Sequence, residues 1–268
     1  MPAEGPRYGY GQLVDYFPPA RAADSRAGAR LSLWWAPLDA SASALRGPAV
    51  SLSPEERQRA DRYHRPVDRG RFVAARRWLR HLLARQLLCV PSEVPIVTDD
   101  LGKPRIAGSD LRFSAARSGG IALYATSWTM EVGVDIESIR AAADVDGIAA
   151  RFFTRAERRA LASLPPAQRR DASFRCWTRK EAYGKGIGTG LDFPLDAVDV
   201  WSDDGRSARV SGWSVHQVAV PAGLAAAVAG ADTEEWIPGL PHRVGGLDSD
   251  WLTPRTTTIV SPAGAAGK

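Results

Sequence analysis

The chain has 268 residues, of which 44% are hydrophobic and 24% are charged, and its formal net charge is +5. This balance is typical of a globular protein with one large domain or two small ones. The longest uncharged apolar run, 218–231, contains Pro221 and is shorter than the ~20 residues that a membrane span needs. The first residues do not resemble a signal peptide, and the chain has two cysteines. We therefore expect a cytoplasmic protein with two buried thiols and no membrane partner.

Strand and helix patterns alternate in the first half of the chain. Ser53 and Glu56 have the spacing of a capping box and mark the start of a short charged helix. Apolar residues with a helical period predict a longer helix at 71–88. The strands predicted before and after these helices lie at 31–38, 94–99, 111–116 and 120–127.

The second half repeats this order. A predicted strand at 132–139 is followed by a charged helix that starts at Thr154, again with a glutamate three residues later, Glu157. A long helix is predicted at 172–186. The strands predicted after it lie at 197–202, 207–220 and 225–230.

The repeated order indicates an internal duplication. We predict an α+β fold of two pseudo-symmetric halves, each a small, mostly antiparallel sheet packed on a long helix, with the active site in the cleft between them. The predicted boundaries are a poorly ordered segment at 1–30, an N-terminal half at 31–131, a C-terminal half at 132–252 and a disordered tail at 253–268. Because one chain supplies both halves, we expect a monomer, in effect a pseudo-dimer.

Positive charge is concentrated between residues 51 and 90, where there are ten arginines and four acidic residues. Such a block indicates an anionic partner: nucleic acid, a phosphorylated small molecule or an acidic protein. A solvated helix surface explains the block equally well.

Lysine is rare in this chain, since only four of the 35 basic residues are lysines. Two of them, Lys180 and Lys185, fall within residues 174–191. A lysine kept where arginine is the rule indicates a place that needs a compact, rotatable ammonium group.

Two carboxylates alternate with apolar residues in GVDIE, residues 133–137. On a strand, Asp135 and Glu137 point to the same face and lie roughly 6.6 Å apart. An ordinary half-exposed strand with a polar outer face has the same pattern.

A third carboxylate, Glu181, shares one stripe of the predicted helix with Trp177 and Lys185. A surface ion pair between Glu181 and Lys185 is the simplest interpretation. However, four glycines follow within 184–190, which favours close approach of another backbone or a ligand over helix stability. Two carboxylates from a strand and one from a helix form an oxygen-ligand set suited to Mg²⁺.

The order GVDIE followed by WTRKEAYGKGIGTGL, residues 177–191, resembles the signature of the Sfp-type 4′-phosphopantetheinyl transferases, GxDIE…WxxKEAxxKxxG. A looser resemblance covers roughly residues 50–230. It implies an enzyme that transfers the 4′-phosphopantetheine arm of coenzyme A to a serine of an apo acyl or peptidyl carrier protein and releases 3′,5′-ADP. It also implies a place in secondary-metabolite biosynthesis and no nucleic-acid partner.

The resemblance assigns roles to the residues of the two motifs. Asp135, Glu137 and Glu181 would hold Mg²⁺ at the pyrophosphate, and Glu181 could also accept the serine proton. Lys185 would neutralise the leaving phosphate. Lys180 would either contact the pyrophosphate or support the fold.

In the family, basic residues of the first half hold the 3′-phosphate of coenzyme A, which implies Arg59, Arg71 and Lys103 here. The chain departs from the family in FSAARSGG, residues 113–120, where much of the family has FNxSHSGG. Arg117 replaces the histidine that contacts a phosphate of coenzyme A. Because arginine can bond a phosphate bidentately, we predict that Arg117 takes over this contact.

Two other functions and one docking surface follow from the same residues. A non-catalytic coenzyme A-binding module would bind the ligand without releasing 3′,5′-ADP, and a nucleic-acid-binding protein would depend steeply on salt. For the carrier, a helix from Thr154 would present Arg155, Arg158 and Arg159 around an apolar centre of Leu161 and Leu164. The alternative is that both leucines turn into the core.

Overall fold

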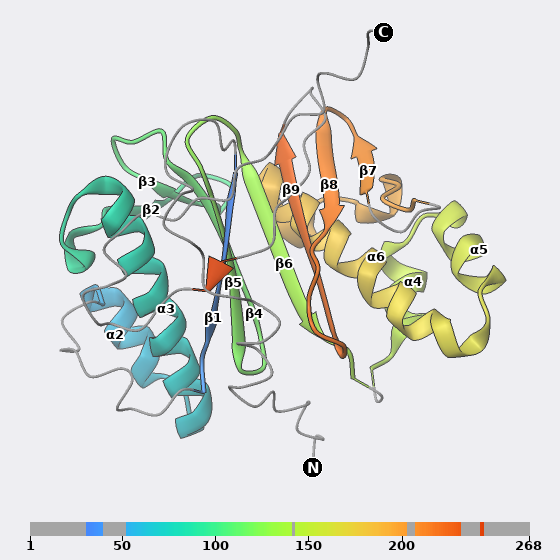
Figure 1. Cartoon of the computed structure of the whole chain (residues 1–268), viewed down its shortest axis with the longest axis horizontal. Helices are drawn as coiled ribbons and strands as arrows, with labels where there is room; N and C mark the ends of the chain where they lie inside the picture. Colours follow the sequence, from blue (N-terminus) through green and yellow to red (C-terminus); the bar gives the residue numbers. More distant parts are fainter. Residues whose placement is uncertain (1–30, 40–51, 141–142, 203–206, 232–241, 244–268) are drawn as a thin grey trace, which may run out of the picture.

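The computed structural model describes residues 31–39, 52–140, 143–202, 207–231 and 242–243. Within these residues the chain forms two α+β halves that lie side by side (Figure 1). The predictions for the segment 1–30 and the tail 253–268 lie outside the described residues.

The first half is a sheet with two helices on one side. Its strand order is β10-β1-β5-β4, with a separate hairpin of β2 and β3. The strands are β1 (Ser32–Pro37), β2 (Ile96–Thr98), β3 (Pro104–Ile106), β4 (Arg112–Ser118), β5 (Ile121–Ser127) and β10 (His242–Arg243), and the helices are α2 (Pro54–Asp61), α3 (Pro66–Leu87) and the 3₁₀ turn η2 (Pro91–Glu93). The buried face of α3 packs on this sheet through Trp78 and Leu82, and Tyr124 Oη of β5 donates a hydrogen bond to Ala75 O at 2.8 Å.

The second half has the same plan. Its four strands are antiparallel, in the order β6-β9-β8-β7. The strands are β6 (Val132–Ser138), β7 (Ser207–Val210), β8 (Trp213–Gln217) and β9 (Leu224–Ala231), and the helices are α4 (Val145–Phe152), α5 (Arg155–Ser163), α6 (Pro166–Ile187) and the 3₁₀ turns η3 (Gly190–Asp192) and η4 (Leu195–Ala197). Helix α6 lies directly on β6. The two backbones are so close at Gly133 that a Cβ added there would collide with the backbone of Ala182 and Gly186.

A shared core and a serine seam join the two sheets. Leu33, Leu123, Val134 and Val228, from β1, β5, β6 and β9, belong to one buried cluster. At the seam, serine hydroxyls of β4 accept hydrogen bonds from the backbone of β6: Val134 N to Ser114 Oγ at 3.0 Å, and Ser138 N to Ser118 Oγ at 2.9 Å. The seam thereby holds the carboxylate-bearing strand against the first half.

The predicted fold class is confirmed, as are both capping boxes, at Ser53 and at Thr154. The long helices begin earlier than predicted, at Pro66 and Pro166, because proline is well suited to a first helical position.

Five details differ from prediction. Residues 207–220 form a hairpin rather than one strand, because Ser211 and Gly212 both adopt positive φ. Residues 197–202 form no strand, and α4 was not predicted. Strand β10 comes from the predicted second half but pairs with β1 of the first half. Cys89, predicted to be buried, is exposed.

None of the described helices is long and apolar enough to cross a membrane.

Candidate active site

Strand β6 directs two carboxylates toward α6. Asp135 and Glu137 share the face on which Gly133 meets α6, while Val134 and Ile136 point into the shared core. Asp135 is only 3% exposed, so this is not the polar outer face of an ordinary strand. Its Oδ2 is buried and has no hydrogen-bond partner among the described residues. Burying an unpaired carboxylate oxygen is costly, so this oxygen is suited to bind a cation.

Helix α6 contributes the carboxylate and the cation that share its predicted stripe. Lys185 Nζ lies 2.6 Å from Asp135 Oδ1 and 3.8 Å from Glu181 Oε2. The Glu181–Lys185 pair is therefore part of a cluster that includes β6, not an isolated surface ion pair. Trp177, the third residue of the stripe, packs on Phe152 of α4 with ring centroids 4.9 Å apart.

The cluster has more negative than positive charge. Burial raises the pKa of Asp135, against the opposing effect of Lys185. Burial and the neighbouring charge of Asp135 raise the pKa of Glu137 to about 7. Burial also raises the pKa of Glu181. One ammonium does not compensate three carboxylates, so the site favours a further cation or protons.

Ser118 extends the site to the first half. Its hydroxyl donates to Glu137 Oε2 at 2.9 Å while accepting from the backbone of Ser138. The sequence contained a signal for this contact, because the alternation in FSAARSGG places Ser114, Ala116 and Ser118 on one face, and all three are buried.

A pocket of about 520 Å³ opens at Lys185, the member of the cluster that lines it. One wall is formed by Lys185, the turn at 188–190 after α6, and Asp192, and the first half supplies the other wall. The lining residues of the first half come from α3 (Arg76, Leu79), the β2–β3 hairpin (Leu101, Gly102, Lys103, Pro104) and β4 (Phe113, Ser114, Ala115). The pocket therefore lies between the halves, where the active site was predicted.

The carboxylates of the cluster are oxygen donors of the kind that a divalent cation prefers. Among the described residues, no group of three His, Cys, Asp or Glu side chains is arranged to hold a metal ion. However, Mg²⁺ commonly takes one or two carboxylates and completes its shell with substrate phosphates and water. The unpaired Asp135 Oδ2 and the raised pKa values of the carboxyl groups fit such a cation.

Two of the predicted phosphate ligands, Arg59 and Arg117, meet at one buried aromatic residue of α3, Phe72. The guanidinium carbons of Arg59 and Arg117 lie 5.5 and 5.8 Å from the centroid of Phe72. Arg117 Nη2 also donates to Tyr63 Oη at 2.9 Å. Arg71 forms two hydrogen bonds to Asp39, at 2.6 and 2.8 Å. Arg59 and Arg117 are exposed to a ligand, whereas an anion at Arg71 would have to displace Asp39.

Lys103 is buried, and its ammonium is already bonded to Glu131 and to the carbonyl of Gly186. It lines the pocket, but two of its three N–H donors are in use. Glu131 was missed by the sequence analysis, because it lies outside both motifs.

Lys180 does not contact the pocket, so its assignment to cofactor binding was wrong. Its side chain is fully buried, with Nζ 2.7 Å from Glu157 Oε2 and donating to Leu195 O and Val198 O. Lys180 supports the fold, which was the other role considered for it.

This arrangement of carboxylates, a lysine and a pocket between the halves is suited to binding a phosphate-bearing ligand together with a cation. The family model described as "4'-phosphopantetheinyl transferase superfamily" matches residues 131–229. The 4'-phosphopantetheinyl transferase HetI of Nostoc sp. is 36% identical over 204 residues, which cover 74% of this chain and 86% of that protein. A putative 4'-phosphopantetheinyl transferase of Synechocystis sp., slr0495, is 36% identical over 62% of this chain and 68% of its own length. Sfp of Bacillus subtilis is 29% identical over 56% of this chain and 66% of its own length.

The chain belongs to the 4′-phosphopantetheinyl transferase family, and it is of the Sfp type. The predicted family and enzyme class are confirmed.

Proposed function

We propose that the chain transfers the 4′-phosphopantetheine arm of coenzyme A to a serine of an apo acyl or peptidyl carrier protein and releases 3′,5′-ADP. The main support is the position of Lys185, which pairs with the buried Asp135 and also lines the pocket between the halves. A cation there is next to both the carboxylates and any phosphate that enters the pocket. Since both pocket walls come from one chain, we also propose that it acts as a monomer, and in the cytoplasm.

The proposed roles follow from the geometry of the cluster. Asp135, Glu137 and Glu181 are the predicted ligands of Mg²⁺. One or two of them, with substrate phosphates and water, would hold the ion, which when bound would screen the charge of the pyrophosphate. Glu181 would accept the serine proton, since its raised pKa makes it a better base. Lys185 would neutralise the 3′,5′-ADP phosphate as its bond to the pantetheine phosphate breaks.

Incubation with coenzyme A, Mg²⁺ and a panel of apo fatty-acid, polyketide and nonribosomal-peptide carriers, followed by intact-mass measurement, tests the function. We expect at least one carrier to gain one phosphopantetheine group with equimolar release of 3′,5′-ADP. A protein that binds coenzyme A without releasing 3′,5′-ADP is a binding module, and salt-dependent binding to nucleic acid without transfer would favour the other alternative.

Stability should depend on pH and Mg²⁺ through Glu137. Its pKa in the folded protein, about 7, exceeds its usual value of 4.5, so the folded state binds more protons between these values. The free energy of unfolding should therefore fall as pH rises through this window and stay low above it. Mg²⁺ should restore stability near pH 8 but have little effect near pH 5, where protons occupy the site.

Thermal unfolding with and without Mg²⁺ at both pH values measures this dependence, and Glu137→Gln should flatten it. Equal Mg²⁺ effects at both pH values would contradict the assignment of these carboxylates to the cation.

Arg117 is predicted to contact the nucleotide of coenzyme A. It is exposed and sits beside Arg59 over Phe72, a surface suited to an anion. Arg117→Ala should raise KM for coenzyme A by about tenfold, with a smaller effect for dephospho-coenzyme A if the contact is to the 3′-phosphate. Steady-state kinetics with both substrates measure this difference. Equal loss for both would move the contact to the pyrophosphate, and unchanged KM would exclude the contact.

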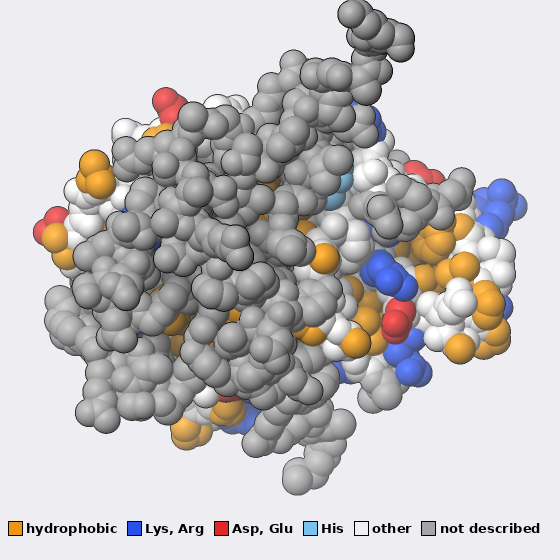
Figure 2. Space-filling view, in the orientation of Figure 1, with side chains coloured by type: hydrophobic (Ala, Val, Ile, Leu, Met, Phe, Trp, Pro, Cys, Tyr) orange, Lys and Arg blue, Asp and Glu red, His pale blue; other side chains and the backbone are white. Residues whose placement is uncertain are grey.

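The predicted docking surface is wrong in part. It lacks the apolar centre, because Leu161 is buried and Leu164 packs against the core of the second half. The basic side remains, since Arg155, Arg158 and Arg159 are exposed. Figure 2 shows basic side chains beside hydrophobic ones over α4, α5 and α6. This surface fits an acidic carrier through charge rather than through the leucines.

Reversing Arg158 and Arg159 to Glu should therefore raise KM for the carrier by roughly tenfold and reduce its salt dependence, with KM for coenzyme A unchanged. Carrier titrations at two salt concentrations provide the measurement, and Arg209→Glu, an exposed reversal on β7, is the matched control. If the double reversal leaves KM for the carrier unchanged, the carrier docks elsewhere.

A further inference from the structure

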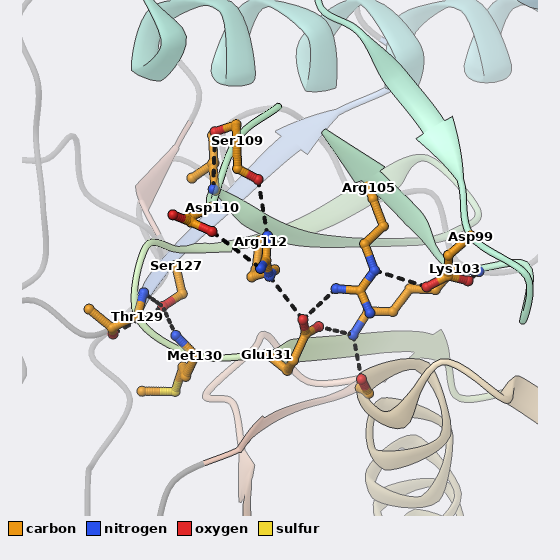
Figure 3. Close-up of polar contacts among 12 residues, drawn as sticks. Asp99, Lys103, Arg105, Ser109, Asp110, Arg112, Ser127, Thr129, Met130 and Glu131 are labelled. Atoms are coloured by element: carbon orange, nitrogen blue, oxygen red, sulfur yellow. Dashed lines mark hydrogen bonds and ion pairs between the residues drawn. The ribbon is translucent and has the colours of Figure 1, made fainter. Parts of the chain in front are cut away.

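Three cationic side chains of the first half pair with Glu131, the residue before β6 (Figure 3). Its Oε2 accepts a hydrogen bond from Lys103 Nζ at 2.7 Å. Its Oε1 lies 2.9 Å from Arg112 Nε and also pairs with Arg105. The hairpin of β2 and β3, together with β4, is thereby anchored at the start of the strand that carries Asp135.

The hairpin presents Lys103 in a fixed position. Asp99 Oδ1 accepts hydrogen bonds from the backbone N–H groups of Leu101 and Lys103, at 3.1 and 2.9 Å. Asp99 Oδ2 accepts from Arg105 Nε at 2.9 Å. The turn and its two cations are therefore bonded to each other as well as to Glu131.

Lys103 links Glu131 to helix α6. Its Nζ also donates to the carbonyl oxygen of Gly186, in the last turn of α6. The last carbonyls of a helix lack intrahelical donors and carry the negative end of the helix dipole, so an ammonium there satisfies both. The stem of Lys103 lies along the turn after the helix, where a Cβ added at Gly188 would be 3.4 Å from it.

Gly186 is confined on its other sides as well. A Cβ at Gly186 would collide with the ring of Trp213 on β8, and Gly133 of β6 approaches its backbone. Lys185 precedes Gly186 directly, and its ammonium reaches Asp135 at 2.6 Å. A displacement of the last turn of α6 would therefore displace the cation at the centre of the site.

We propose that Glu131 is a positioning residue for the transfer reaction: through Lys103 it holds the last turn of α6 and so fixes Lys185 between Asp135 and the pocket. The inference rests on the proposed function and adds a residue outside both sequence motifs. It gives Lys103 a different role from the contact with the 3′-phosphate predicted from the family, because the ammonium of Lys103 is buried and bonded to protein groups.

The test compares Glu131→Gln, Lys103→Met and the double variant. Each single change should lower kcat by roughly ten- to a hundredfold, since small displacements at a reacting centre have effects of this size, and KM for coenzyme A should stay within about twofold. The double variant should be no slower than Lys103→Met, because Glu131 acts through Lys103. Asp110→Asn is the matched control, since Asp110 pairs with Arg112 at the exposed edge of the same network, 3.6 Å away. It should match the wild type.

Three kinetic results would overturn the proposal: unchanged kcat in both single variants, additive losses in the double variant, or a raised KM for coenzyme A with kcat retained in Lys103→Met. The last result would make Lys103 a phosphate ligand. Hydrogen exchange supplies a readout that does not depend on activity. Glu131→Gln should speed amide exchange in residues 184–188, and it should lower the midpoint of thermal unfolding less than a core substitution does. If the wild type modifies no carrier, the proposed function fails by itself, and unchanged exchange at 184–188 would still overturn the positioning role.

Discussion

Glu181→Gln is expected to slow phosphopantetheinyl transfer by about a thousandfold, because it removes a proton acceptor and a metal ligand at once. The substitution keeps the size of the side chain and its packing on α6. Burial raises the pKa of Glu181, which means that its ionised form is disfavoured in the folded protein. The amide should therefore leave the free energy of unfolding unchanged or slightly higher near pH 8.

Transfer rates at saturating coenzyme A, carrier and Mg²⁺, together with urea unfolding of the same samples, check both parts of this prediction. Glu93→Gln is the matched control, because Glu93 is an exposed glutamate of η2 in the first half. A rate near that of the wild type at saturating Mg²⁺ would show that Glu181 neither binds the metal nor accepts the proton.

Lys180→Met is expected to have the largest effect on stability, a loss of about 3–5 kcal/mol in the free energy of unfolding. Lys180 and Glu157 are both fully buried, with Nζ and Oε2 2.7 Å apart. Glu157 also accepts hydrogen bonds from the backbone of Thr154 at 2.7 Å and of Val200 at 2.8 Å. Removing the ammonium would leave a buried carboxylate without its counter-charge and the carbonyls of Leu195 and Val198 without a donor.

Denaturant unfolding measures the loss, and the double variant with Glu157→Gln should lose less than the sum of the single changes. Arg69→Met is the control, because its pair with Asp61, at 2.7 Å, is exposed and should contribute less than about 1 kcal/mol. Under conditions where Lys180→Met is folded, KM for coenzyme A should equal that of the wild type. A raised KM with stability intact would return Lys180 to the cofactor site.

Local patterns predicted the parts of the site that depend on one element. The alternation in GVDIE placed Asp135 and Glu137 on one face of β6, and the four-residue spacing placed Glu181 above Lys185 on α6. Such spacings fix directions along an element, and these directions were correct.

Contacts between distant segments could not be predicted in this way. The rarity of lysine marked Lys180, but its partner, Glu157, lies on a different helix, and only the fold brings the two together. The same limit applies to Lys103, whose bond to Gly186 joins residues 83 positions apart in the chain. The rarity of lysine therefore indicated that Lys180 and Lys185 sit where an ammonium is needed, but not whether the partner is a phosphate or a protein group.

Single-turnover formation of 3′,5′-ADP and holo carrier by the wild type and by Asp135→Asn tests the central claim, that the carboxylates between β6 and α6 carry out the transfer. Coenzyme A, carrier and Mg²⁺ are saturating, and bound coenzyme A is measured in the same samples. We predict one 3′,5′-ADP per modified carrier for the wild type, and bound coenzyme A with neither product on the same time scale for the variant. Transfer by Asp135→Asn at a rate comparable to that of the wild type would contradict the account.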